Sequence, residues 1–379
     1  MKDKKILVLN FGGTSSKCSI YDNDVCTEDY EIKYTKEEEE LGSDGKTQAA
    51  LKKRQLLEWF DRLGLKISDF DAIAIRGGGT FNGAQGGTFL VDEKLHAHLR
   101  SLYTPDLPPI HAARIMIEVV DQLLQDAGVS VPIYSTDPCS VNQMPDYARV
   151  SGCPGLVKRT SFHALNQRAV ARLAAEDLGK TYETARVIVA HCGGGVSVGA
   201  HEYGRVIEVN DSTGDGDGPM SSNRAGTVPT GQLVHLCFSG KYTEQEVLNL
   251  LRKSSGLKGY LGTTDLREVE KRMDEGDEEC RKIFEALAYQ ISCQIGICYA
   301  ALKCECDVIA VTAGMSKSKR LVAAIEERVG KMAPVKVYSG DYENRALALG
   351  AYRVLEGAEK ASVYTGEEGY MQPVTPWKK

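Results

Sequence analysis

Short runs of apolar residues alternate along the chain with longer segments in which apolar residues recur every three or four positions. The short runs at 71–75, 131–135, 308–312 and 335–338 predict buried strands. The longer periodic segments predict helices that end near Gly128 and Gly179, and a longest helix over about 278–303. The apolar positions of the first two helices are Ile115, Val119, Leu123, Ala127 and Leu165, Ala169, Leu173. Strands interleaved with helices indicate a mixed α/β fold.

The beginning of the chain is repeated near its middle. Residues 6–25 (ILVLNFGGTSSKCSIYDNDV) align without gaps with residues 187–206 (VIVAHCGGGVSVGAHEYGRV), an offset of 181 positions. Gly12 then aligns with Gly193, Gly13 with Gly194 and Ser16 with Ser197. Each copy has an apolar run, a glycine turn and a second apolar run, which predicts a β-hairpin. We therefore expect a duplicated fold.

Length and charge narrow the class of protein. A chain of 379 residues is long enough for two domains at roughly 150 residues each. The net charge of -6 offers no general attraction to nucleic acid or anionic lipid, so neither is expected as a partner. The first apolar run is too short for a signal peptide, and no run approaches the roughly 18 residues of a membrane span. We expect a cytoplasmic protein.

Two polar features are interpreted without a functional role. Eleven cysteines are scattered from Cys18 to Cys306 without zinc-finger spacing, so we expect reduced, partly buried side chains. A metal or redox role is the alternative. The polar stretch Thr47–Arg54 predicts a solvated helix face.

The glycine turns of the two hairpins are candidate phosphate-binding loops. Glycine lets backbone N–H groups approach the oxygen atoms of a polyphosphate without obstruction by a Cβ atom. Neither loop has the Walker A ending or the dinucleotide-binding glycine spacing. A glycine triplet taken alone is more often only a tight turn, but the presence of a glycine turn in both copies of the hairpin favours phosphate binding.

Seven motifs in order along the chain resemble one superfamily. They are N-F-G-G-T-S-S-K (10–17), R-G-G-G (76–79), Q-G-G-T-F (85–89), F-H-A-L-N-Q (162–167), H-C-G-G-G-V-S-V-G-A-H (191–201), G-P-M-S-S-N-R-A-G (218–226) and E-N-R-A-L-A-L-G-A (343–351). The duplicated hairpin resembles the core of the acetate kinase, sugar kinase, Hsp70 and actin superfamily. The detailed motifs are similar to the acetokinase family, in particular to its butyrate kinases.

The resemblance implies a fold and a reaction. The fold would be two duplicated actin-like (ribonuclease H-like) α/β domains with a nucleotide cleft between them. The first domain would comprise 1–157 plus 343–379, and the second, 158–342, would bind the adenosine. The reaction would be reversible in-line phosphoryl transfer between ATP and butyrate or a branched short-chain acid such as isobutyrate, with Mg²⁺. A homodimer or larger homo-oligomer is also implied.

The resemblance also assigns catalytic residues. Arg76 and Arg224 match arginines at the carboxylate and the transferring phosphoryl group, and planar guanidinium groups suit both. His163 matches a histidine that hydrogen-bonds the phosphoryl group. We expect it to act as a neutral donor near a helix N-terminus, with Ser161 as the N-cap. Asp137 matches an aspartate that orients one arginine, although an aspartate before proline is commonly a turn former.

The nucleotide and metal residues follow from the same motifs. Asn10 and Glu343 match positions that hold Mg²⁺ largely through water, although Glu343 could equally be a first-turn helix acid. The expected nucleotide-binding residues are Asn10, Gly12, Gly13, Ser16, Lys17, His191, Gly193, Gly194, Gly195 and Gly314.

Some residues differ from the family motifs, and the sequence leaves alternative functions open. Gly13 stands where relatives usually carry serine, and Ala313 stands where they carry glycine. An acetate or propionate kinase is the nearest alternative, because one methylene changes discrimination by only about 1–3 kcal/mol. A non-catalytic ATP-binding scaffold would not need Arg76, His163 and Arg224 together. A sugar kinase would need a carboxylate base, for which Asp137 is the candidate.

Overall fold

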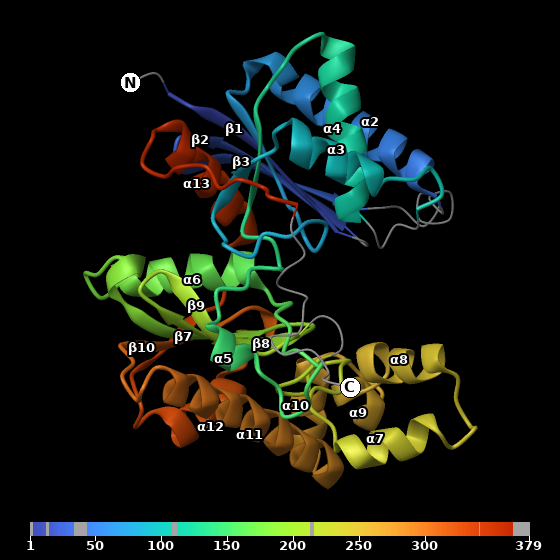
Figure 1. Cartoon of the computed structure of the whole chain (residues 1–379), viewed down its shortest axis with the longest axis vertical. Helices are drawn as coiled ribbons and strands as arrows, with labels where there is room; N and C mark the ends of the chain where they lie inside the picture. The colour runs from blue at the N-terminus through green and yellow to red at the C-terminus, as the bar shows by residue number, and fades with distance from the viewer. Residues whose placement is uncertain are drawn as a thin grey trace. The chain divides into compact units, whose positions relative to one another are not determined.

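The chain folds into two compact α/β units. The computed structural model describes residues 3–12, 15–33, 44–107, 112–212, 216–340 and 342–366. The described residues up to Val141 and those from Tyr342 onward form the first unit, and those from Asn142 to 340 form the second. Each unit is built on one mixed β-sheet with helices on both faces (Figure 1).

The sheet of the first unit has six strands in the order β3-β2-β1-β4-β6-β5. Its strands are β1 (Lys5–Phe11), β2 (Ser15–Asp22), β3 (Val25–Lys33), β4 (Ala72–Ile75), β5 (Thr88–Leu90) and β6 (Ile133–Thr136). Strands β1, β2 and β3 pair antiparallel, whereas β1, β4 and β6 pair parallel. The inner strands β1 and β4 are buried on both faces, as expected for parallel strands covered by helices.

Helices cover both faces of this first sheet. They are α2 (Gly45–Leu63), α3 (Glu93–Ser101), α4 (Ala112–Ala127) and α13 (Glu343–Leu355), with a short 3₁₀ turn η1 (Ile67–Asp69). Helix α4 packs on β1 and α2, while α13 packs on β1, β4 and β6 (Figure 1). Asp44 caps α2 by accepting a hydrogen bond from the Thr47 N–H at 2.8 Å, and Gly64 ends it in the left-handed conformation.

The sheet of the second unit has five strands in the order β11-β10-β7-β8-β9. They are β7 (Arg186–Cys192), β8 (Val196–Glu202), β9 (Arg205–Val209), β10 (Val308–Thr312) and β11 (Val335–Tyr338). Helix α6 (Ala164–Glu176) packs on one face and the long helix α11 (Glu278–Ala301) on the other (Figure 1). The remaining elements are α5 (Asp146–Arg149), η3 (Tyr182–Thr184), α7 (Thr230–Cys237), α8 (Glu244–Lys253), α9 (Gly256–Leu261), α10 (Leu266–Asp274), η4 (Gly314–Lys317) and α12 (Lys319–Val329).

The predicted duplicated α/β fold is confirmed. Both sheets contain the expected hairpin, β1 with β2 and β7 with β8, and each hairpin is antiparallel. The strands and helices predicted from apolar spacing all occur, and α11 matches the expected longest helix closely. Gly128 and Gly179 have φ values of 62° and 68°, the left-handed conformation that ends a helix.

The solvated helix face predicted for Thr47–Arg54 is wrong in part. Gln48, Ala49 and Lys52 of α2 are buried. The Lys52 amine donates a hydrogen bond to the Ser16 hydroxyl at 2.9 Å and lies 4.9 Å from the centre of the Phe11 ring. The methylene stem of lysine is apolar, so a lysine that is counted as polar in the sequence can still pack into the protein interior.

Lys52 should make stability depend on pH in the alkaline range. Burial lowers the pKa of its amine from 10.5 to about 8. Between these values Lys52 binds more protons in the unfolded chain, so its contribution to stability should rise with pH, by about 3 kcal/mol in total at 1.4 kcal/mol per pH unit. The buried thiols act in the opposite direction at the upper end of this range, so urea unfolding at pH 7.5 to 10.5 is compared between variants. Lys52→Met should lack the rising contribution, and Lys53→Met should keep it. Equal slopes in all three proteins would contradict the assignment.

The cysteines are free thiols, and four of them, Cys18, Cys192, Cys280 and Cys298, are buried. Burial raises the pKa of Cys18 and Cys192 to about 12, so these thiols stay protonated at neutral pH. Within the described ranges, no helix is long and apolar enough to cross a membrane.

Candidate active site

The second glycine loop joins β7 to β8 and is held closed by hydrogen bonds. The Gly193 N–H donates to the Gly195 carbonyl at 3.0 Å. The hydroxyls of Ser221 and Ser222 donate to the Gly194 carbonyl at 2.9 and 3.1 Å. These hydrogen bonds tie the loop to itself and to the segment that carries Ser221 and Ser222.

Arg224 and His163 meet at Gly195. A Cβ atom on Gly195 would lie 2.2 Å from Arg224 Nη1 and 3.2 Å from His163 Cε1, so only glycine leaves room for both side chains. Arg224 Nη1 also donates to the Ser212 carbonyl, which orients the guanidinium. Burial lowers the pKa of Arg224, and the Asp211 carboxylate opposes that shift. The structure therefore brings Arg224, His163 and the glycine loop together within the second unit.

His163 stacks on His191. Their ring centroids are 3.8 Å apart and the planes differ by 8°. The Asn166 Oδ1 atom, which can only accept, lies 2.8 Å from His191 Nδ1, so His191 carries a hydrogen on Nδ1. His163 itself is the N-cap residue of α6, which corrects the prediction that Ser161 is the cap. A helix N-terminus and a nearby guanidinium both disfavour a second proton on His163.

A cavity of about 730 Å³ joins the glycine loop to the start of η4. Gly193, Gly194 and Gly314, three of the predicted nucleotide residues, line it together. The rest of its lining includes Asp265, Arg267, Glu270 and Lys317, which sequence reasoning missed. Asp265 and Glu270 belong to an ordinary helix start and surface pattern, so no sequence signal distinguished them.

Ala313, immediately before Gly314, is strained. Its φ of 70° and ψ of -169° lie in a region that only glycine adopts readily. Ala313→Gly should therefore raise the free energy of unfolding by about 1 kcal/mol, the strain of about 1–3 kcal/mol less the entropy cost of glycine. Urea midpoints measure this, with Ala310→Gly in β10 as a matched control that should destabilise. A lower midpoint for Ala313→Gly would refute the strain.

Three residues predicted for the first unit lie together at the end of β1. Asn10 Nδ2 donates to Glu343 Oε2 at 2.9 Å, joining β1 to the first turn of α13. Arg76 Nη1 lies 3.5 Å from Asn10 Oδ1, and Arg76 Nη2 lies 3.7 Å from Glu343 Oε1. An arginine, an amide and a carboxylate therefore form a cluster. Asn10 and Glu343 lie more than 300 residues apart in the sequence, and the fold brings them into contact.

The other predicted residues of the first loop divide between the two faces of the hairpin. Lys17 is exposed and pairs directly with Asn10, so both side chains point to one face. Ser16 is fully buried on the opposite face, where it accepts the hydrogen bond from Lys52. This contact directs Ser16 into the core. Gly12 follows β1 and is partly exposed, whereas Gly13 lies outside the described residues.

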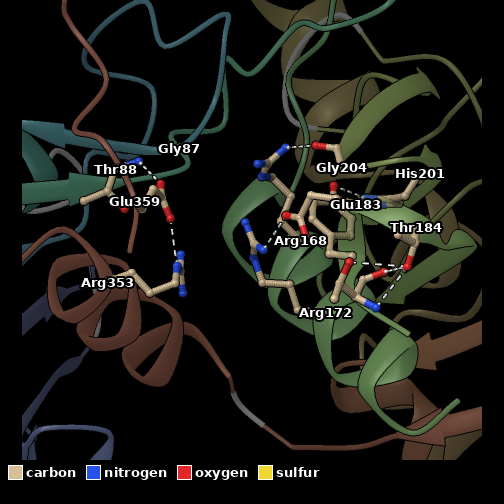
Figure 2. A network of polar contacts seen from close by, with 12 residues as sticks. Gly87, Thr88, Arg168, Arg172, Glu183, Thr184, His201, Gly204, Arg353 and Glu359 are labelled. Atoms are coloured by element: carbon tan, nitrogen blue, oxygen red, sulfur yellow. Dashed lines mark hydrogen bonds and ion pairs between the residues drawn. The ribbon is translucent and has the colours of Figure 1, made fainter. Parts of the chain in front are cut away.

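Asp137 is bound to a neighbouring loop. It follows β6, has a φ of 43°, and its Oδ1 accepts a hydrogen bond from the Gly87 N–H at 2.7 Å. The segment beginning at Gly87 is tied down further: Glu359 accepts from the Thr88 N–H at 3.2 Å and from Arg353 Nε at 2.7 Å (Figure 2). These contacts fit the turn-forming alternative for Asp137.

These features define a class of protein. Glycine hairpins with an arginine and a histidine against one loop place backbone N–H groups, a cation and a hydrogen-bond donor where they can bind a phosphorylated ligand. The chain belongs to the acetokinase family, whose model matches residues 5–355.

Relatives and solved structures agree with this membership. The chain is 40% identical over 364 residues to a protein named "Probable butyrate kinase" from Clostridium botulinum (strain Alaska E43 / Type E3), covering 95% of this chain and 99% of the relative. It is 38% identical over 360 residues to "Butyrate kinase 1" from Clostridium acetobutylicum, with the same coverage. The acetate kinase of Porphyromonas gingivalis matches in fold with a TM-score of 0.74 at 20% identity, covering 93% of this chain and 100% of that one.

Proposed function

We propose that this protein is an ATP-dependent kinase that reversibly phosphorylates butyrate, or a branched short-chain acid such as isobutyrate, to its acyl phosphate. Membership of the acetokinase family and the names of relatives at 38–40% identity support a carboxylate acceptor. The observation that carries the proposal is the meeting of Arg224 and His163 at Gly195.

The chemistry needs cations and donors more than it needs a base. A carboxylate is already deprotonated at neutral pH, and one of its oxygens attacks the γ-phosphorus of ATP. The bond from that phosphorus to the β,γ-bridging oxygen breaks, and ADP leaves with the oxygen. Arg224 and Arg76 are proposed to neutralise the carboxylate and the phosphoryl oxygens with planar, two-pronged hydrogen bonds. His163 is proposed to donate to the phosphoryl group in the transition state.

The nucleotide would be bound by glycine-rich backbone. We assign the phosphates to the two hairpin loops, with the residues Gly12, Gly13, Lys17, His191 and 193–195. We assign the adenosine to the second domain, 158–342, in the cavity beside Gly314. Ser16 is proposed to act indirectly, through its contact with Lys52. Asp137 is proposed to hold the loop at Gly87.

Mg²⁺ fits the donors of the Asn10 and Glu343 pair. Mg²⁺ keeps several waters and takes one or two protein oxygens together with substrate phosphates. The pair offers the amide oxygen of Asn10 and the carboxylate of Glu343. The hydrogen bond from Asn10 Nδ2 to Glu343 Oε2, at 2.9 Å, holds the two side chains together. Among the described residues no cluster of three or more His, Cys, Asp or Glu side chains offers an all-protein metal site. When bound, Mg²⁺ would neutralise phosphate charge.

We propose that the alkyl chain of the acid enters an apolar cavity beside Arg224. The cavity measures about 250 Å³, and Val196, Leu233, Leu248 and Leu251 contribute to its wall. Leu248→Trp should fill part of it and lower kcat/KM for butyrate relative to acetate by about tenfold, within the range expected for one or two methylenes. The same ratio measured for Tyr289→Phe, an exposed position, should not change. An unchanged ratio in Leu248→Trp would exclude this cavity.

The direct test is acyl phosphate formation, trapped with hydroxylamine, from ATP, Mg²⁺ and straight and branched acids from acetate to isovalerate. A maximum at four or five carbons is expected. A maximum at acetate or propionate would reassign the substrate. Bound ATP without product for any acid would overturn the proposal in favour of a non-catalytic scaffold.

A further inference from the structure

A buried chain of hydrogen bonds leads from the protein interior to His163. Ser197 Oγ, on β8, lies 2.9 Å from His163 Nδ1. Gln167 Nε2, on α6, lies 2.7 Å from the same hydroxyl and 3.0 Å from the Ser197 carbonyl. Gln167 Oε1 lies 3.2 Å from His201 Nε2, and His201 Nδ1 lies 2.9 Å from the Tyr182 hydroxyl. We call these five residues the buried chain.

The direction of each hydrogen bond follows from groups that can act in only one way. The Ser197 carbonyl only accepts, so the amide nitrogen of Gln167, not its oxygen, must face it. Gln167 Oε1 therefore faces His201 and can only accept, so His201 Nε2 donates. The second hydrogen of the amide donates to Ser197 Oγ. Each step leaves one arrangement.

His201 is held neutral, which completes the inner end of the buried chain. Its side chain is fully buried, and burial together with the charges of Arg168 and Arg172 lowers its pKa to about 3. Figure 2 shows both arginines near His201, with Arg172 bonded to Glu183 and Arg168 bonded to the Gly204 carbonyl. Because the one ring proton of neutral His201 is on Nε2, its Nδ1 accepts a hydrogen bond from the Tyr182 hydroxyl.

The outer end of the buried chain faces His163. The Ser197 hydroxyl accepts from Gln167. Its contact with His163 Nδ1 allows two directions, and donation by the hydroxyl is the one that gives the serine hydrogen a partner in the buried chain. Ser212 Oγ lies further from Nδ1, at 3.4 Å, and reaches the Ser161 carbonyl at 3.3 Å. A neutral imidazole that accepts at Nδ1 carries its hydrogen on Nε2.

We propose that Ser197 and Gln167 are positioning residues that hold His163 as the neutral Nε2–H tautomer. The catalytic consequence rests on the proposed function, in which Nε2–H is the donor to the transferring phosphoryl group. The guanidinium of Arg224 and the N-terminus of α6 both disfavour an imidazolium at His163, while the Asp211 carboxylate beside Arg224 acts in the opposite direction.

A glycine on β8 provides the space that the buried chain requires. A Cβ atom on Gly199 would lie 2.3 Å from Gln167 Oε1 and 3.4 Å from His201 Nε2. Gly199 therefore lets the Gln167 amide lie between Ser197 and His201. The motif V-S-V-G-A-H at 196–201 thus supplies a hydroxyl, a gap and a buried histidine on one face of one strand, since alternate residues of a strand share a face.

The tautomer can be measured without any assay of activity. In protein labelled with ¹⁵N-histidine, two-bond nitrogen–proton couplings distinguish Nε2–H from Nδ1–H, and the signal absent in His163→Gln identifies His163 among the seven histidines. The wild-type protein should show Nε2–H. Ser197→Ala should shift His163 toward Nδ1–H, and Gln167→Met, which removes the donor to Ser197, should give a mixture. Ser292→Ala is the matched control, because its buried hydroxyl bonds only the Ala288 carbonyl of its own helix.

Kinetics provide the second readout. Ser197→Ala should lower kcat by about 10- to 100-fold with little change in KM for ATP, since a wrongly held histidine tautomer affects the transition state more than binding. Ser197→Cys, which keeps a weak donor, should recover part of kcat. A wild-type His163 with Nδ1–H, or a tautomer that Ser197→Ala leaves unchanged, would overturn the proposal. If no acid is phosphorylated but the tautomer responds as described, the buried chain stands and the proposed function fails.

Discussion

Replacing Arg224 with alanine is expected to lower the rate of acyl phosphate formation by about 10³-fold or more, the range found when an arginine that stabilises phosphoryl transfer is lost. The side chain is largely buried, donates to the Ser212 carbonyl and reaches Gly195. Its removal leaves the incoming carboxylate and the phosphoryl oxygens without one of their proposed cationic partners. Initial rates with hydroxylamine trapping measure the effect.

Two further variants separate lost chemistry from lost folding. Arg224→Lys keeps the charge but not the planar fork, so it should recover only a small part of the rate. Arg328→Ala removes an exposed ion pair with Glu285 and should leave the rate near wild type. If Arg224→Ala kept more than a tenth of the wild-type rate, the role assigned to Arg224 would be wrong.

Gly195→Ala is expected to lower kcat by about 100-fold while the protein remains folded, because a displacement of about 1 Å in a catalytic group can cost that much. The new methyl group would lie 2.2 Å from Arg224 Nη1, the flexible end of a side chain that can move away. The substitution should therefore displace the guanidinium and crowd His163 rather than disrupt the sheet.

The matched control for Gly195→Ala is Gly296→Ala in α11. There the nearest neighbour of an added Cβ is Met332 Cε at 3.9 Å, so the methyl group fits. Alanine should stabilise this helix by roughly 0.5–1 kcal/mol, and the rate should not change. Circular dichroism and thermal unfolding establish that both variants are folded. Wild-type activity in Gly195→Ala would show that Arg224 and His163 need not meet at this glycine.

Much of the fold follows from local pattern. Apolar runs located the buried strands, three- and four-residue spacing located α4, α6 and α11, and the 181-residue offset located both hairpins. These predictions succeed because burial on one face, or on two, imposes a period on the sequence. The duplicated hairpin identified 193–195, and the motifs that resemble the acetokinase family identified Arg224 and His163, which the fold brings to Gly195.

Contacts between segments that are distant in the sequence decided the features that local patterns did not predict. Lys52 and Lys53 are the same residue type, but Lys53 is only partly buried, and the packing of α2 on the first sheet is what buries Lys52 fully. The strain at Ala313 became visible only as a backbone angle. The buried chain joins residues of η3, α6 and β8. Gln167, Ser197 and His201 lie within the motifs at 162–167 and 191–201, but only the packing of α6 on the second sheet shows that they contact one another.

The sequence by itself determined the duplicated α/β architecture, the two glycine hairpins and the arginine and histidine candidates, because periodicity, glycine turns and motif order are local properties. Only the tertiary structure decided which polar side chains are buried, and in which direction their hydrogen bonds run. Both depend on what packs against a residue from elsewhere in the chain, and a donor or acceptor acquires a fixed role only when its partner's role is fixed.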